Sequence, residues 1–111
     1  DGAYLKMAEH VHGLATLSRN GVSIPRTYIL KIQDSASKTI NEWKLEGGTQ
    51  TVRADTAYII NDILSDPDAS YFSQKIQRYK GNKGEWKFAV KTGTTNDAKD
   101  GWMTGYSTKY A

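Results

Sequence analysis

Apolar residues repeat at intervals of three and four near the start of the chain, which predicts an amphipathic helix over residues 4–20. The apolar face consists of Tyr4, Met7, Ala8, Val11, Leu14 and Ala15. Asn20 and Gly21 follow this pattern, and these residue types commonly end a helix because they tolerate the left-handed conformation. The first element is therefore expected to be a helix that ends at an Asn-Gly pair.

A second helix is predicted over residues 54–65, after a link at residues 49–52. Its apolar positions at helical spacing are Ala57, Ile60 and Leu64. A shorter third helix is predicted over residues 69–79, where aromatic and apolar positions recur before two glycines.

Apolar and polar residues alternate in two other regions, which predicts strands. Residues 26–45 are expected to form a β-hairpin, with polar turn residues at 34–37. A strand over residues 86–90 runs on into a Lys-Thr-Gly sequence, and a polar loop at 96–101 leads to a last strand over 102–106. The pattern thus predicts the α+β class, with helices packed on an antiparallel sheet.

The chain has 111 residues and a mass of 12.4 kDa, which suits one domain or a piece of one. It has no cysteine, and this excludes disulfides, thiol catalysis and cysteine-based metal sites. No run approaches the roughly 18 apolar residues of a membrane span. Because the first residue is Asp1 and no methionine precedes it, we expect an excised or processed segment.

The net charge of +3 is unevenly distributed, because residues 75–91 carry six cations and one acid. Such a segment is either a solvated face or a binding site for an anionic polymer such as nucleic acid or a cell-wall polymer. Residues 81–84 form a G-x-x-G loop like that of KH-type RNA clamps, but here the loop leads into a strand. A tight turn is the better interpretation, and no nucleic-acid partner is expected.

Two patterns suggest metal sites, and both fail. His10 and His12 are two residues apart on a predicted helix, so their side chains point about 200° away from each other. The loop at 96–101 has Ala98 where a calcium loop needs a ligand. We therefore expect no metal ion and no cofactor.

The chemistry expected of the Lys91–Thr95 segment is recognition of anions and acyl groups. Lys91 supplies a cation, Thr92 and Thr94 supply hydroxyls, and Gly93 lets a ligand approach the backbone.

Together with residues 100–106 (DGWMTGY), residues 91–95 (KTGTT) resemble the K-T-G region of penicillin-binding proteins, whose other signatures are S-x-x-K and S-x-N. Residues 54–67 are similar to the helix that precedes this box in class A enzymes, and residues 14–32 are similar to an upstream helix-strand passage. The resemblance implies that residues 1–111 are the C-terminal portion of a transpeptidase domain with the penicillin-binding protein/serine β-lactamase-like fold.

The resemblance also implies a function. The parent would be a D,D-transpeptidase that cross-links peptidoglycan stem peptides, reacts with β-lactams, and is held by an N-terminal anchor outside the cytoplasm. Lys91 and Thr94 would be catalytic, with the Thr94 N–H forming half of the oxyanion hole. Thr92, Gly93, Thr94 and Thr95 would bind substrate.

The sequence departs from the family where the nucleophile is concerned. S-x-x-K occurs at residues 35–38 and S-x-N at 18–20, but their order is reversed and Ser35 falls in a predicted turn. Both matches are interpreted as accidental, so the nucleophile and the rest of the domain are expected upstream of Asp1. The chain alone is expected to be inactive. A serine β-lactamase relative and a non-catalytic module that binds an anionic polymer through residues 75–91 stay open as alternatives.

Overall fold

The computed structural model describes residues 4–69 and 87–111. The elements, in chain order, are α1 (Met7–Ser18), β1 (Val22–Ser23), β2 (Lys31–Gln33), β3 (Thr39–Glu42), β4 (Thr49–Gln50), α2 (Ala54–Ser65), β5 (Ala89–Thr94), the 3-10 turn η1 (Asn96–Ala98) and β6 (Gly101–Tyr106). This composition confirms the α+β class. The third helix predicted over residues 69–79 and the G-x-x-G loop lie outside the described residues, apart from Ala69.

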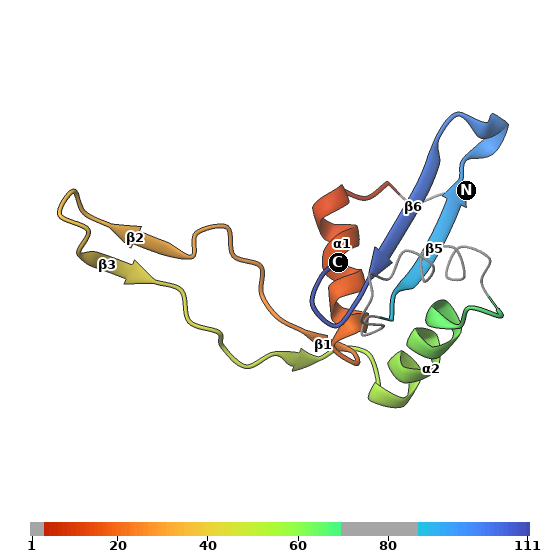
Figure 1. The fold of residues 1–111 in the computed structure, drawn as a ribbon, viewed down its shortest axis with the longest axis horizontal. Coiled ribbons are helices and arrows are strands. Elements are labelled where there is room, and N and C mark those ends of the chain that lie inside the picture. Colours follow the sequence, from red (N-terminus) through yellow and green to blue (C-terminus); the bar gives the residue numbers. More distant parts are fainter. Residues whose placement is uncertain (1–3, 70–86) are drawn as a thin grey trace, which may run out of the picture.

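We call α1, α2, β5 and β6 the body of the molecule. The antiparallel β5–β6 ribbon packs against both helices, with α2 beside β5 and α1 beside β6 (Figure 1). The apolar core of the described residues is small and comes from α2 and the ribbon. It consists of Ala57, Ala89, Val90 and Tyr106.

A polar network around Asn61 joins three elements of the body. The Tyr106 hydroxyl of β6 donates to Asn61 Oδ1 at 2.7 Å, and Asn61 Nδ2 donates to the Leu17 carbonyl of α1 at 2.9 Å. Burial raises the pKa of Tyr106 above its ordinary value, because the charged form would lose its hydration. Asn61 and Tyr106 lie 45 residues apart, so no local pattern indicates this contact.

The chain leaves α1 through the predicted Asn-Gly pair, which is confirmed. Asn20 and Gly21 both have left-handed backbone, with φ of 52° and 89°. A side chain at Gly21 would also collide with the Val52 carbonyl, so this position requires glycine. The Gly21 carbonyl in turn accepts the N–H groups of Thr51 and Val52 at 2.9 and 3.2 Å. The helix itself begins at Met7, three residues later than predicted.

The prediction that residues 49–52 are only a link is wrong. Within this segment β4 pairs antiparallel with β1, with Val22 opposite Gln50 and Ser23 opposite Thr49. Each strand has two residues, too few to show any alternation. Long-range pairing, rather than local pattern, creates this short ladder.

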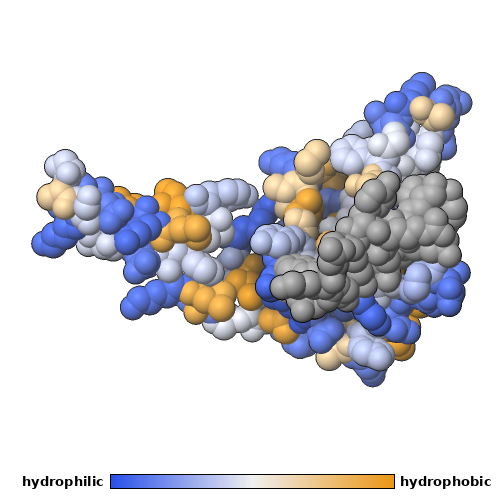
Figure 2. Space-filling view, viewed as in Figure 1, coloured by the Kyte–Doolittle hydropathy of each residue, from blue (hydrophilic) through white to orange (hydrophobic). Residues whose placement is uncertain are grey.

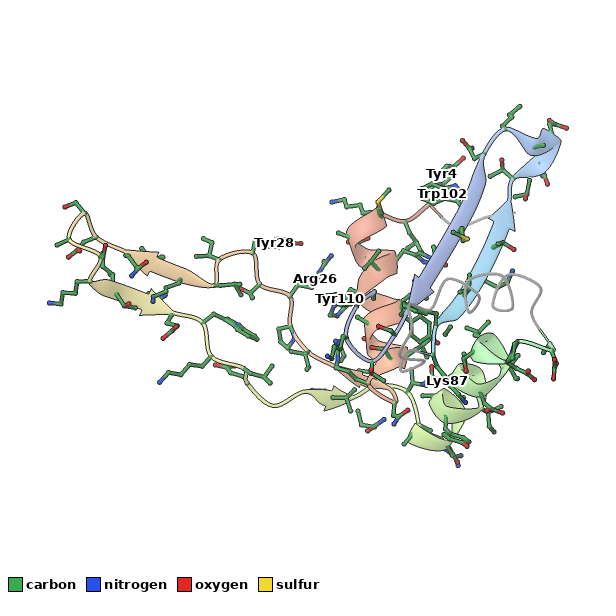
Figure 3. All side chains as sticks on the ribbon, in the orientation of Figure 1. Tyr4, Arg26, Tyr28, Lys87, Trp102 and Tyr110 are labelled. Carbon is green, nitrogen blue, oxygen red and sulfur yellow. The ribbon has the colours of Figure 1, made fainter. Side chains whose placement is uncertain are left out.

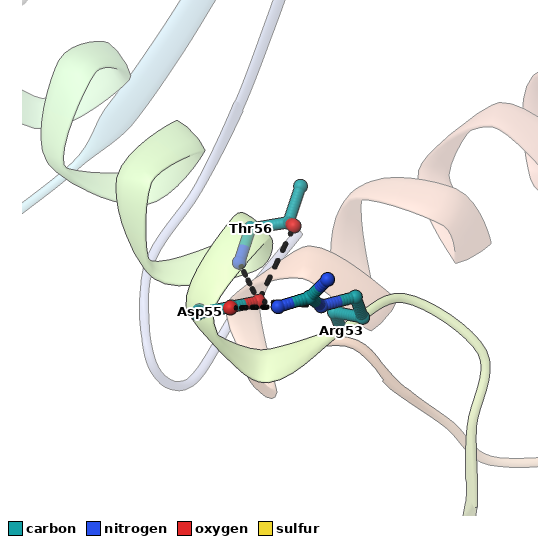
Figure 4. A network of polar contacts seen from close by, with 3 residues as sticks. All are labelled: Arg53, Asp55 and Thr56. Carbon is teal, nitrogen blue, oxygen red and sulfur yellow. Dashed lines mark hydrogen bonds and ion pairs between the residues drawn. The ribbon is translucent and has the colours of Figure 1, made fainter.

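Helix α2 has the predicted bounds, and its first turn holds a polar cluster (Figure 4). Asp55 Oδ1 accepts Arg53 Nε at 3.2 Å and the Thr56 N–H at 2.7 Å. The Arg53 guanidinium and then the Thr56 N–H hold the pKa of Asp55 below its usual range. An acidic group here also suits the positive end of the helix dipole.

Strands β2 and β3 form an arm that projects away from the body (Figure 1). The predicted hairpin is confirmed, with strands shorter than the pattern suggested. Asp34 Oδ1 accepts the N–H groups of Ala36 and Lys38 at 2.9 Å each, and Ser37 has a left-handed φ of 63°. All residues from 28 to 50 are exposed. The radius of gyration is accordingly 17.4 Å, against about 13 Å for a compact domain of this length.

Candidate functional site at the open edge of β5

The pairing of β5 with β6 determines which backbone groups of the Lys-Thr-Gly segment are available. Lys91 lies opposite Thr104 and Gly93 opposite Trp102. The Thr95 N–H donates to the Asp100 carbonyl at 3.0 Å, which identifies this pair as hydrogen-bonded. In an antiparallel ladder such pairs alternate, so Lys91 and Gly93 direct their backbone groups toward β6.

The backbone groups of Thr92 and Thr94 consequently point away from β6, toward the other edge of β5. No strand among the described residues pairs with this edge. Lys91 Nζ donates to the Thr92 carbonyl, which places the ammonium group at the same edge. The open edge thus brings together a cation, the Thr92 carbonyl and the Thr94 N–H.

Gly93 keeps this edge accessible. A Cβ atom at Gly93 would meet nothing within 4 Å, and the residue is exposed on the same strand face as Lys91. Its φ is not in the left-handed region, so the backbone itself does not demand glycine. The missing side chain therefore leaves space for a ligand.

Thr95 has a different position from the other threonines. Its hydroxyl accepts the Asp100 N–H at 2.8 Å, and its backbone N–H is bonded to the Asp100 carbonyl. Two left-handed residues, Asp97 and Ala98, complete the loop between β5 and β6. Thr95 therefore closes this loop and holds the end of β5 in place.

The charge at the edge comes from Lys91, which forms no ion pair in the described part of the chain. Lys99, on the neighbouring loop, lies 3.6 Å from Asp97. Lys91 is thus free to meet an incoming anion. The basic segment 75–91 is described only from Lys87 onward, so most of it lies outside the described residues.

The two serine motifs lie away from this edge. Ser35 is in the hairpin turn at the far end of the arm from β5 (Figure 1). Ser18 is at the end of α1 and donates its hydroxyl to the Ala15 carbonyl at 2.8 Å. In the described part of the chain, neither serine hydroxyl is hydrogen-bonded to a lysine, histidine or carboxylate side chain, the contact by which a base activates a serine.

The histidines do not form a metal site. His12 Nε2 lies 3.3 Å from Ser23 Oγ and so links α1 to β1. In the described residues no group of three side chains could hold a metal ion.

An apolar groove of about 840 Å³ runs between the N-terminal segment with α1 and the strand β6. Tyr4, from the N-terminal segment, and Trp102, from β6, both line this groove (Figure 3). The other apolar side chains that line it are Leu5, Met7, Val11, Leu14, Met103 and Ala111. The sequence pattern did not predict this groove, although the helical spacing does predict the apolar face of α1 that lines it.

The body is thus a helix-backed antiparallel ribbon with a Lys-Thr-Gly edge. No family model matches the chain. Over 85 aligned residues it is 33% identical to penicillin-binding protein 1A of Pseudomonas aeruginosa (strain PAO1), an alignment that covers 73% of this chain. The match spans 9% of that protein's length. The similarity suggests a region related to penicillin-binding proteins. In the described residues no helix has the length and apolar character needed to cross a membrane.

Proposed function

We propose that this chain is the C-terminal portion of a peptidoglycan D,D-transpeptidase domain with the penicillin-binding protein fold. The parent protein would face outward from the cytoplasmic membrane and cross-link stem peptides through an acyl-serine whose serine lies outside residues 1–111. The observation that carries the proposal is the open edge of β5, where Lys91 and the Thr94 N–H lie beside the bare Gly93. The partial similarity to penicillin-binding protein 1A supports it.

Each residue of the edge has a role in this proposal. The Lys91 ammonium attracts the terminal carboxylate of the substrate, and the hydroxyls of Thr92 and Thr94 donate hydrogen bonds to it. The Thr94 N–H forms one half of the oxyanion hole, a contact typically worth ~3 kcal/mol in the transition state. The substrate lies along β5 as an added strand, which the bare Gly93 permits. Thr95 contributes by holding the loop. No cofactor or metal is required.

The rest of the transpeptidase domain is the proposed partner of the body. Two observations support this part of the proposal. An apolar groove runs beside β6, and at least half of the surface of Met7, Trp102 and Met103 is exposed there. Among the described residues, a core of four apolar side chains is small for a body of two helices and a ribbon. Further protein packed on this surface would complete the core.

The test is made in the complete parent protein, by measuring the second-order rate of acylation by benzylpenicillin. Lys91→Ala should slow acylation at least tenfold, equivalent to about 1.4 kcal/mol, because a cation aimed at a carboxylate is lost. Gly93→Val should also slow it strongly, because the side chain blocks the approach to the edge. Both variants should melt like the parent.

Matched controls are available for both substitutions. Lys99→Ala removes an exposed lysine from the adjacent loop, and Gly47→Val adds a side chain at a glycine of the arm with open space around it. Both controls should acylate at the parent rate. If Lys91→Ala and Gly93→Val also acylate at that rate, the assignment of the site is wrong. The isolated chain should form no adduct with a fluorescent penicillin, and stoichiometric labelling of Ser18 or Ser35 would contradict the proposed division of the domain.

A further inference from the structure

The Asp100-Gly101 pair links the loop after β5 to the first residue of β6. An aspartate or asparagine that precedes a glycine can react with its own backbone, because the glycine nitrogen can attack the side-chain carbonyl carbon and close a five-membered ring. Glycine favours this attack because it has no side chain to hinder it. The sequence has three such pairs, at residues 1–2, 20–21 and 100–101, and the first lies outside the described residues.

The Asn20-Gly21 pair is closed to this reaction by its surroundings. Gly21 is buried, and its N–H donates to the Thr16 carbonyl at 2.9 Å. Asn61 Nδ2 donates to the side-chain oxygen of Asn20 at 3.3 Å, so the amide is also engaged. By sequence alone this pair is the more reactive one, because an amide is a better electrophile than a carboxylate. The tertiary structure therefore protects the pair that would otherwise react first.

The Asp100-Gly101 pair lacks these restraints. Because Thr95 and Asp100 form a hydrogen-bonded pair and such pairs alternate, the next residue, Gly101, directs its N–H away from β5. Among the described residues no strand pairs with that edge of β6. The Asp100 side chain is exposed at a hydrophilic tip of the molecule (Figure 2), and it forms no ion pair in the described part of the chain. The nitrogen and the carboxyl group are therefore both free to react.

We propose that the Asp100-Gly101 pair is a site of spontaneous modification, at which Asp100 converts to isoaspartate in the folded chain. The Gly101 nitrogen forms a bond to Cγ of the protonated Asp100 side chain, and the Cγ–OH bond breaks. The hydroxyl leaves as water with the proton of the nitrogen, which gives a succinimide ring. Water then adds at the main-chain carbonyl of Asp100 and breaks its bond to the nitrogen, so the chain continues through Cβ and Cγ. The reaction needs no enzyme and no reactant besides water.

The modification changes the end of β5. In isoaspartate the Asp100 carbonyl group, which accepts the Thr95 N–H at 3.0 Å, leaves the main chain and becomes a free carboxylate. The main chain gains one methylene carbon before Gly101, the residue that pairs with Thr94. The pairing that positions Thr94 is therefore weakened. This last consequence alone rests on the proposed function, in which the Thr94 N–H belongs to the oxyanion hole and acylation would decline as the protein ages.

The test is incubation of the full chain in neutral buffer for several weeks, followed by peptide mapping. Isoaspartate is detected by enzymatic methylation with a protein-isoaspartate methyltransferase, and deamidation of Asn20 by the mass increase of its peptide. In native buffer, isoaspartate should form at residue 100 faster than Asn20 loses its amide. Unfolding in urea should speed the Asn20 reaction at least about tenfold, because its protecting hydrogen bonds are lost, and should leave the rate at residue 100 almost unchanged.

Variants of the pair test the mechanism. Gly101→Ala places a methyl group beside the attacking nitrogen, and it fits because a Cβ atom there would meet nothing within 4 Å. This variant should slow isoaspartate formation at least about tenfold. Asp100→Glu keeps the charge but requires a six-membered ring, so it should abolish the reaction. The control is Gly47→Ala, at a glycine that also has open space and follows an acid, Glu46; it should react like the wild type.

Two results would overturn the proposal. One is a faster change at Asn20 than at residue 100 in native buffer, and the other is equal isoaspartate formation in the wild type and Gly101→Ala. Hydrogen exchange of the Gly21 amide, which is bonded to Thr16, reports that each variant keeps the fold. The measurement follows a chemical change in the chain and not transpeptidase activity, so the proposed function can fail while this proposal holds.

Discussion

The body and the arm of this molecule are held together in different ways. In the body, residues far apart in the sequence meet: Tyr106 of β6 bonds to Asn61 of α2, which bonds to Leu17 of α1. In the arm, the contacts are local, between residues about four to thirteen apart on one hairpin. The body therefore buries its few core residues, whereas the arm is held by hydrogen bonds and buries none of its side chains.

This difference determines how much each region contributes to the free energy of unfolding. Burial of apolar area contributes about 25 cal/mol per Å², so the body contributes most of the stability and the arm little. The apolar side chains of the arm are exposed and so contribute little burial to this stability. Substitutions of similar chemistry should have different effects in the two regions.

The largest difference is expected between two aromatic residues. Tyr106→Ala removes a buried ring and should cost about 3–5 kcal/mol of the free energy of unfolding of the body. Trp43→Ala removes an exposed ring on the arm and should change that free energy by less than about 0.5 kcal/mol in dilute solution. Urea unfolding followed by circular dichroism measures both. Equal losses would show that the arm is part of the cooperative unit.

A smaller difference is expected between two asparagines. Asn61→Ala leaves the Tyr106 hydroxyl and the Leu17 carbonyl without their partner and should cost about 1–3 kcal/mol. Asn41→Ala, on the exposed arm, should be close to neutral. The same unfolding experiment compares them. A neutral Asn61→Ala would mean that water replaces the network without loss.

The smallest effect concerns pH. Because burial raises the pKa of Tyr106 in the folded state, the folded chain holds this proton more tightly than the unfolded chain. The stability that this group contributes is fully present below its unfolded pKa of 10.0 and is lost as the pH rises through the higher folded pKa. Melting temperatures measured above pH 10 should therefore fall less steeply for Tyr106→Phe than for the wild type. Tyr58→Phe, at an exposed position of α2, serves as the control and should follow the wild type.

Local pattern was sufficient for the elements that depend on local interactions. The bounds of α2, the hairpin of the arm and the left-handed exit at Asn20 and Gly21 all follow from residue spacing and turn chemistry. The β1–β4 pair was missed because a two-residue strand has no period to detect. The groove beside β6 was missed because it forms between segments about ninety residues apart.

The same division holds for the candidate site. The sequence by itself determined that a lysine, three threonines and a glycine occur consecutively at residues 91–95, and this composition already indicates anion recognition. Only the tertiary structure decided which of their groups are available. The register with β6 turns the Thr92 and Thr94 backbone outward and uses the Thr95 hydroxyl in the loop. A strand has two edges, and its composition does not specify which edge stays open. Pairing with another strand decides this, because successive residues direct their backbone groups to opposite edges, so that those not bonded to the partner strand face the open edge.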